Sequence, residues 1–101
     1  MSKIKTLDIE LLEQSANMLR ALAHPQRIEI LNMLQQSEKL TVGEIQANLN
    51  ITQSSTSHHL GILKGKGILN SKRHGKKIYY ELKHKKLSQI INCIMSCATD
   101  E

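Results

Sequence analysis

Hydrophobic residues recur at helical spacing over long stretches of the chain. In residues 8–23 and 84–98 they return every three or four positions, which predicts an amphipathic helix in each. Pro25 is expected to open a further helix, because a proline at the first helical position gives up no hydrogen bond there. That helix is expected to run to a polar connection at residues 36–39, and its buried face is predicted to contain Ile28, Ile30, Leu31 and Leu34.

Residues 41–63 predict two short helices joined by a tight turn. Thr41 lies three residues before Glu44. At this spacing the threonine hydroxyl can accept from the glutamate backbone N–H while the glutamate carboxylate accepts from the threonine backbone N–H. Asn50, Ile51 and Thr52 can end the first short helix and cap the second. This arrangement is the outline of a helix-turn-helix.

The pattern changes after Gly67 from helical to strand-like. Residues 68–82 predict a two-stranded hairpin, or wing, whose turn at residues 72–77 is basic. Tyr79 and Tyr80 point to opposite faces of the second strand, so one is expected to be buried and the other to reach a nucleic-acid backbone. An isolated hairpin is only marginally stable in water, and this one is therefore expected to pack on the helices.

The complete order of elements predicts one domain over residues 1–101, mainly α with a two-stranded β-hairpin: a winged helix-turn-helix. The apolar stripe of residues 84–98 is wider than a small monomer easily covers. The chain has no Phe or Trp, so its core must be aliphatic and modest, which makes burial between two copies favourable. A homodimer is therefore expected, with residues 8–23 and 84–98 as its dimerisation helices.

The second helix of the helix-turn-helix begins with hydroxyl and amide side chains, a poor choice for helix propensity alone. Such groups suit base edges and phosphates in a major groove of double-stranded DNA. The alternative is a surface turn with an excess of capping residues. The residues predicted to contact DNA from this helix are Gln53, Ser54, Ser55, Thr56, Ser57 and His58.

The distribution of charge supports a phosphate-binding surface. Residues 1–60 hold five Lys and Arg against six Asp and Glu, whereas residues 61–101 hold nine against three. A basic excess beside a helix-turn-helix is the electrostatic footprint of nucleic-acid binding, although a solvated charged face is the commoner meaning of a charge run. The phosphate contacts predicted from this segment are Lys64, Lys66, Arg73, His74, Lys76 and Lys77.

Three further side chains near the helix starts have predicted positions. His24 is expected to cap the helix that Pro25 opens, and Arg27 is expected to lie on its outside. His59 is expected to pack or form hydrogen bonds within the recognition helix, in contrast to the DNA-facing His58.

Composition excludes several classes of protein. Two cysteines are too few for a disulfide scaffold, which favours a reducing, cytoplasmic compartment. The sequence contains no apolar run of the roughly 18 residues that a membrane span needs, and its first residues lack the apolar core of a signal peptide. It also lacks a nucleophile–base pattern, a glycine-rich phosphate loop and a carboxylate pair at working spacing. We therefore expect no membrane association and no enzymatic activity.

Several separated motifs resemble the ArsR-type (ArsR/SmtB) family of small bacterial repressors. They are AHPQRIEIL at residues 23–31, LTVGEI at 40–45, QSSTSHHLGIL at 53–63, GIL at 67–69 and GKKIYYEL at 75–82. Each motif alone is weak, but together they follow the order of the family. The resemblance implies a homodimer that binds an imperfect inverted repeat near its own promoter. It also implies that transcription is repressed until an inducer lowers the affinity for DNA.

The sensor sites known in the family match this chain only in part. Thr41 and Gly43 supply no thiol where some members carry cysteine on the third helix, and Asn32 stands where a sulfur-sensing branch has a second-helix thiol. Positions of the last helix that match another branch are His84, Lys86, Cys97 and Asp100. His84 and Cys97 lie 13 residues apart, about 20 Å along a helix, so they can share an ion only across a dimer.

No cofactor is required by these patterns, and Cys93 and Cys97 leave three alternatives open. The two thiols lie on one helical face, where they pack at the dimer interface, bind zinc or another thiophilic metal ion, or act as a redox switch. The ligand set for a metal would be His84, Cys93, Cys97 and Asp100. Alternatives to a repressor are a winged-helix module that binds other proteins and a non-specific architectural DNA-binding protein.

Overall fold

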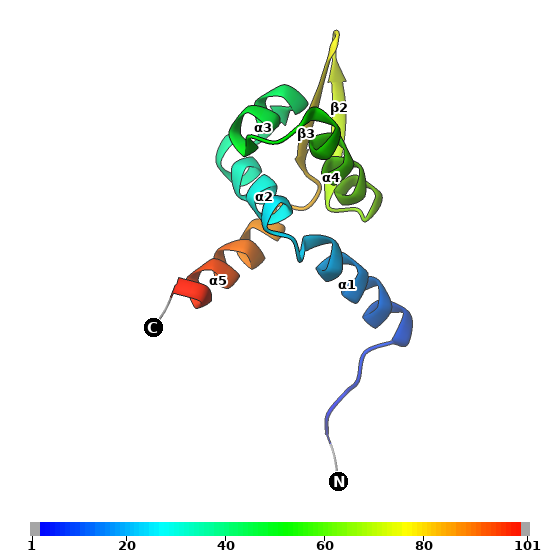
Figure 1. The fold of residues 1–101 in the computed structure, drawn as a ribbon. Coiled ribbons are helices and arrows are strands. Elements are labelled where there is room, and N and C mark those ends of the chain that lie inside the picture. The colour runs from blue at the N-terminus through cyan, green and yellow to red at the C-terminus, as the bar shows by residue number, and fades with distance from the viewer. Residues whose placement is uncertain (1–2, 100–101) are drawn as a thin grey trace.

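The computed structural model describes residues 3–99 of the chain, and Figure 1 shows their arrangement. The helices are α1 (Ile9–Leu22), α2 (Pro25–Ser37), α3 (Val42–Leu49), α4 (Gln53–Gly65) and α5 (Leu87–Thr99). The strands are β1 (Lys39–Thr41), β2 (Leu69–His74) and β3 (Lys77–Leu82). The predicted winged helix-turn-helix is confirmed. The helix expected from residue 84 begins only at Leu87, because residues 83–86 form a bend and a turn.

The sheet has one strand more than predicted. Strand β1 lies antiparallel to β3, with Leu40 opposite Tyr80 and Thr41 opposite Tyr79, and the strand order is β1-β3-β2. The expectation of a two-stranded hairpin is therefore wrong, and residue 39 belongs to a strand rather than to a polar connection. The added strand ties the wing to the start of the helix-turn-helix.

Helix α3 begins with the predicted capping box. The Thr41 hydroxyl accepts from the Glu44 backbone N–H at 3.2 Å, and the Thr41 backbone N–H donates to the Glu44 carboxylate at 2.8 Å. The backbone N–H and then the hydroxyl of Thr41 hold the pKa of Glu44 below its ordinary value, because both bonds favour the ionised carboxylate. At the other end, Asn50 adopts a left-handed conformation with φ 57° and ends the helix.

Helix α2 lies at the centre of the hydrophobic core. Its residues Ile30, Leu31 and Leu34 have at most 1% of their surface exposed, whereas Ile28 is only half-buried. The other buried side chains of the same core come from the remaining helices and from the start of β2; among them are Leu22, Ile45, Leu60, Leu63, Ile68, Leu69, Leu87 and Ile91. This core fixes α4 and the wing on one body.

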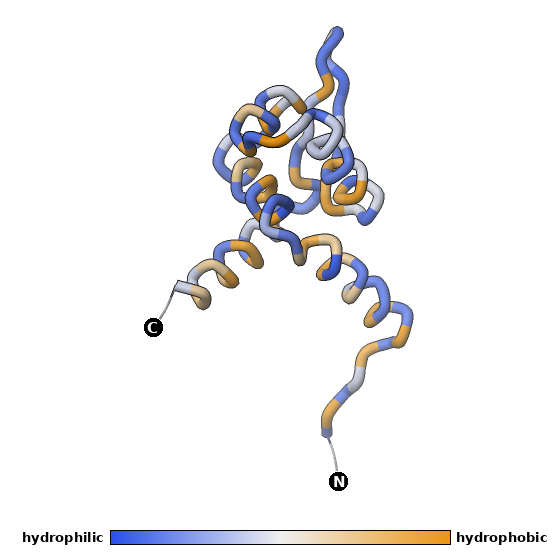
Figure 2. Tube along the Cα trace, viewed as in Figure 1, coloured by the Kyte–Doolittle hydropathy of each residue, from blue (hydrophilic) through white to orange (hydrophobic). Residues whose placement is uncertain are grey.

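Helices α1 and α5 extend away from that body, and hydrophobic residues follow both along their length (Figure 2). Their outward apolar side chains lack cover within one chain: Ile9 is 63% exposed, Leu19 59% and Ile94 56%. Burial of such surface in a partner is favourable by about 25 cal/mol per Å². None of the helices within residues 3–99 combines the length and apolar character that a membrane-spanning segment needs.

Candidate nucleic-acid interface

The start of α4 is built by a second cap. The Thr52 hydroxyl accepts from the Ser55 backbone N–H at 3.1 Å, which satisfies one of the free N–H groups of the first turn. Helix α3 ends at Asn50, so the two helices are joined by residues 50–52 alone. This short connection holds the N-terminal half of α4 at the surface of the helix-turn-helix.

One side of α4 presents polar side chains to solvent, as the DNA-binding prediction requires. The exposed residues are Gln53, Ser54, Ser55, Ser57 and His58. They supply amide, hydroxyl and imidazole groups, which can donate to and accept from base edges. The surface carries no salt bridge among the described residues of this helix.

Thr56 does not belong to this surface, so its predicted DNA contact is wrong. Its side chain is fully buried, and its hydroxyl donates to the Thr52 carbonyl at 2.9 Å. Thr56 precedes Leu60 and Leu63 by four and seven residues, and this spacing places all three on the core side of the helix. The role of Thr56 is to pack α4 and close its first turn.

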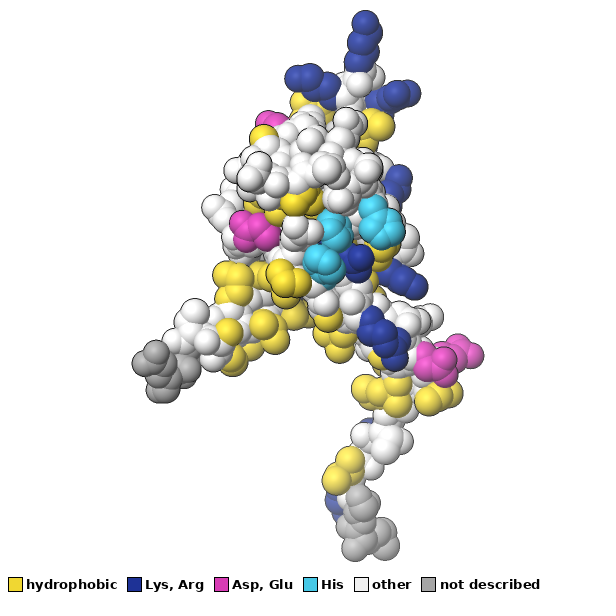
Figure 3. All heavy atoms as spheres, viewed as in Figure 1, with side chains coloured by type: hydrophobic (Ala, Val, Ile, Leu, Met, Phe, Trp, Pro, Cys, Tyr) yellow, Lys and Arg dark blue, Asp and Glu magenta, His cyan; other side chains and the backbone are white. Residues whose placement is uncertain are grey.

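The wing ends in a tight turn that carries positive charge. Gly75 has φ 65°, and residues 75–76 connect β2 directly to β3, a two-residue turn in which a positive φ at the first position favours glycine. Lys and Arg side chains surround the tip in Figure 3. The exposed basic residues of the wing are Lys72, Arg73, His74, Lys76 and Lys77.

The two tyrosines of β3 have different surroundings, since Tyr80 packs against the core and Tyr79 lies beside His74 and Lys39. Tyr79 and Tyr80 are both half-buried, which corrects the expectation that one would be buried and the other exposed. The His74 ring lies 5.6 Å from the Tyr79 ring, and the Lys39 ammonium lies 5.0 Å from its centroid. Lys72 is paired with Glu81 at 3.2 Å. Arg73, Lys76 and Lys77 make no salt bridge among the described residues and are available to phosphates.

Lys64 and Lys66 lie where α4 ends and β2 follows. Both are exposed, and Gly67 turns the chain with φ 74° so that the Ile68 N–H donates to the Leu63 carbonyl at 2.9 Å. The predicted helix end is confirmed. These two lysines therefore lie at the opposite end of α4 from its hydroxyl-rich first turn.

A cluster of polar side chains joins α4 to α2. His24 caps α2 as predicted, since its Nδ1 accepts from the Gln26 N–H at 3.2 Å. Arg27 is half-buried rather than outside, and its Nε donates to His59 Nδ1 at 3.0 Å. His59, only 6% exposed, also meets Gln26 Oε1 at 2.9 Å. Its hydrogen bonds thus reach α2. The expectation that they would stay within the recognition helix is wrong.

Burial holds the pKa of His59 below its ordinary value, and the charges of His24, Arg27 and His58 lower that pKa further. The neutral imidazole is therefore the native form. Sequence reasoning missed this group because the partners Arg27 and His59 are 32 residues apart.

The described members of the predicted metal site, His84, Cys93 and Cys97, form no metal-binding group within one chain. Cys93 and Cys97 are exposed on α5, His84 lies in the turn before that helix, and Asp100 falls outside the described residues. Among residues 3–99, no group of three or more His, Cys, Asp or Glu side chains is arranged so that it could hold a metal ion. His84 could join the two thiols at one ion only from a second copy of the chain.

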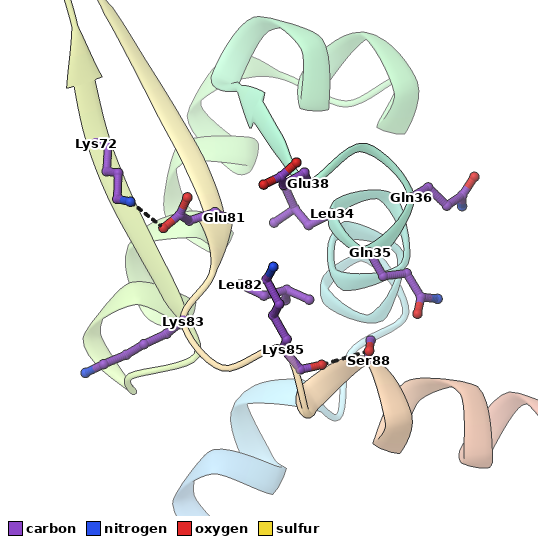
Figure 4. Close-up of a pocket in the computed structure, with 10 residues that line it drawn as sticks. All are labelled: Leu34, Gln35, Gln36, Glu38, Lys72, Glu81, Leu82, Lys83, Lys85 and Ser88. Atoms are coloured by element: carbon purple, nitrogen blue, oxygen red, sulfur yellow. Dashed lines mark hydrogen bonds and ion pairs between the residues drawn. The ribbon is translucent and has the colours of Figure 1, made fainter.

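An open groove of about 650 Å³ lies between the end of α2, strand β3 and the start of α5 (Figure 4). Its charged side chains include Lys72 and Glu81, which pair with each other, while Ser88 donates to the Lys85 carbonyl at 2.8 Å. This lining offers hydrogen bonds but no nucleophile with an adjacent base. It does not indicate catalysis.

Comparison with known proteins places the chain in a family. The family model described as bacterial regulatory protein, arsR family, matches residues 24–71, from the cap of α2 into β2. A biofilm growth-associated repressor of Agrobacterium fabrum is 38% identical over 88 residues, which cover 85% of this chain and 74% of that protein. The chain belongs to the ArsR family.

Solved structures of similar proteins share the ArsR-family fold. The crystal structure of the transcriptional repressor PagR of Bacillus anthracis has a TM-score of 0.78 and 36% identity, covering 86% of this chain and 99% of that one. The homodimeric winged helix-turn-helix DNA-binding domain Mb0332 of Mycobacterium bovis has a TM-score of 0.82 and 26% identity, covering 97% and 90%. This ArsR-family chain is a DNA-binding transcriptional regulator and not an enzyme.

Proposed function

We propose that this chain is a homodimeric repressor that binds an inverted-repeat operator upstream of its own gene. The observation that carries the proposal is the pairing of an exposed polar face on α4 with a basic wing tip on the same body. The helix would read base edges in the major groove, and the wing would hold phosphates. A protein with this task acts in the cytoplasm, where bacterial chromosomes lie.

The dimer is supported by the uncovered helices. Helices α1 and α5 both present large apolar side chains to solvent, although each also contributes residues to the core. A second copy of the chain is the simplest partner to cover these apolar faces, because a two-fold dimer places two recognition helices on the two half-sites of an inverted repeat. The named relatives PagR and the Agrobacterium protein are both repressors.

Two substitutions distinguish the contacts made to bases from those made to phosphates. Gln53→Ala is expected to cost about 1–3 kcal/mol on the preferred operator and to relax sequence preference, because an amide that reads a base edge is lost. Arg73→Ala is expected to weaken binding to all duplexes alike. It should also reduce the slope of log affinity against log salt by about 0.9, the value of one phosphate contact. Fluorescence anisotropy on operator and shuffled duplexes over a salt series measures both effects.

Lys5→Ala is the control for Arg73→Ala, since it removes one positive charge from the N-terminal segment, far from the wing tip (Figure 1). It should leave the salt slope unchanged. An equal loss of sequence preference in Gln53→Ala and Arg73→Ala would contradict the assigned roles. Salt-sensitive binding of the wild-type chain without any sequence preference would favour the architectural alternative.

For the inducer, we propose a thiophilic ion that acts on α5. Cys93 and Cys97 are exposed one helical turn apart, and two thiolates form half of a tetrahedral set. His84 of the partner subunit and Asp100, three residues after Cys97 in the same chain, are the candidate completing ligands. Bound metal would change how the two dimerisation helices pack, and thereby the affinity for DNA.

Addition of zinc or arsenite to the reduced protein–operator complex is expected to release DNA, with anisotropy at fixed salt as the readout. The Cys93→Ser/Cys97→Ser variant should keep its affinity for the operator when zinc or arsenite is added. The matched control is Ser88→Ala with Ser96→Ala, which alters α5 without touching a thiol. Release that persists in the cysteine variant would contradict thiol sensing and return both residues to a packing role.

A further inference from the structure

One side chain connects three helices of the DNA-binding body. Arg27 belongs to α2, its Nη1 donates to the Ala21 carbonyl near the end of α1 at 3.2 Å, and its Nε donates to His59 Nδ1 on α4 at 3.0 Å. Figure 3 shows histidine side chains gathered where α4 comes near the end of α1. The guanidinium is planar and presents its N–H groups in fixed directions, so both bonds constrain the same plane.

The hydrogen bonds of His59 define its tautomer. Because Arg27 Nε carries a hydrogen and donates, His59 Nδ1 must accept. The remaining proton of the neutral ring is therefore on Nε2, which donates to Gln26 Oε1 at 2.9 Å. The His24 ring lies 4.6 Å away and closes one side of the cluster. Both ring nitrogens of a nearly buried imidazole are thus satisfied by residues of α2.

The cluster lies between the helix expected to form the dimer and the helix expected to read DNA. We propose that Arg27 and His59 are positioning residues that fix the recognition helix α4 relative to α1, and thereby set the half-site spacing that the dimer accepts. The proposal rests on the proposed function, since it concerns how the operator is bound. Spacing depends on the separation of the two recognition helices, because half-sites must repeat with the turn of the duplex.

The link works only with neutral His59. A proton on Nδ1 would replace the acceptor with a donor aimed at the Arg27 guanidinium, and it would add a positive charge beside another. The groups that face the ring are Arg27 and Gln26 from α2, His24 from its cap, His58 from α4 and, through Arg27, the carbonyl of Ala21. No carboxylate of the described residues is bonded to the ring to offset that charge.

The direction of the pH effect follows from linkage. His59 has a lowered native pKa, so the unfolded chain takes up the proton first as the pH falls below about 6.5. Stability is therefore full above that value and decreases between it and the lower native pKa. Spacing preference is a property of the folded protein, so it should decrease only as the pH falls through the lower native pKa, where the ring becomes protonated and no longer accepts from Arg27.

The test compares operator duplexes with the natural spacing and with one base pair added between the half-sites. One base pair shifts the half-sites by about 3.4 Å and rotates them, so the wild-type chain should prefer the natural spacing by about tenfold or more at pH 7.5. Arg27→Gln should bring the two affinities close together. Arg20→Gln is the matched control, since the Arg20 side chain on α1 is exposed and, within residues 3–99, donates only to Asn17 Oδ1, at 2.7 Å.

Two further variants separate positioning from simple structural support. Arg27→Lys retains the charge but lacks the planar pair of donors, so it should fold and still lose most of the spacing preference. In His59→Asn the amide oxygen can accept where Nδ1 does. That variant should keep the preference at pH 7.5 and retain it as the pH falls through the native pKa of His59, where the wild-type chain loses it.

The outcomes distinguish this inference from the function on which it rests. A wild-type chain that binds no duplex would overturn the repressor and the positioning role together. Normal binding, with Arg27→Gln and Arg27→Lys both keeping the wild-type spacing ratio, would overturn the positioning role alone. A pH profile of His59→Asn that matches the wild-type profile would show that protonation of His59 does not open the link.

Discussion

Ile94→Asp is expected to convert the dimer into monomers and to weaken operator binding by about a hundredfold or more. Ile94 is 56% exposed on α5, on the apolar side of the helix that residues 3–99 leave uncovered. A carboxylate at that position would lose its hydration in the dimer without gaining a partner. A monomer binds one half-site at a time. It therefore loses the increase in affinity, about 10²–10⁴-fold, that two linked binding modules provide.

Sedimentation velocity and fluorescence anisotropy on the same samples would measure this effect. Gln89→Asp is the control, because Gln89 is exposed on the same helix and lies about 140° around its axis from Ile94. The control should remain a dimer with wild-type affinity. A dimeric Ile94→Asp protein with unchanged operator binding would show that α5 does not form the interface.

Most helices of this chain could be predicted because their signals are local. The Thr41–Glu44 capping box and the His24-Pro25 pair lie within a few residues of the helix starts that they determine. The helical spacing of hydrophobic residues then predicted the bounds of the remaining helices to within a few residues. Strand β1 could not be found in this way, since its three residues become a strand only by pairing with Tyr79, Tyr80 and Glu81.

The types of residue at the candidate site could be predicted from the sequence, but the position and partners of each side chain could not all be predicted. The exposed face of α4 follows from its hydroxyl and amide residues, yet the same criterion wrongly included Thr56. Helical phase would have excluded it, because Thr56 aligns with Leu60 and Leu63. The bond from Arg27 to His59 spans 32 positions, and no local pattern indicates such a distant partner.

Sequence-specific binding to the chain's own upstream region is the second large effect that we expect. The polar face of α4 can discriminate bases, whereas the wing and the lysines contribute attraction that is equal for all sequences. Specific sites are typically bound about 10³-fold or more tightly than other DNA at one salt concentration. We expect a difference of that order, with two protomers bound to each inverted repeat.

The most direct test is therefore anisotropy of the reduced wild-type protein on a duplex from its own upstream region and on a shuffled duplex of equal length. The protein is titrated into both duplexes at one fixed salt concentration. Preference for the upstream duplex by about three orders of magnitude, at two protomers per site, is the predicted result. Equal affinity for the two duplexes would contradict the assignment of this chain as a sequence-specific repressor.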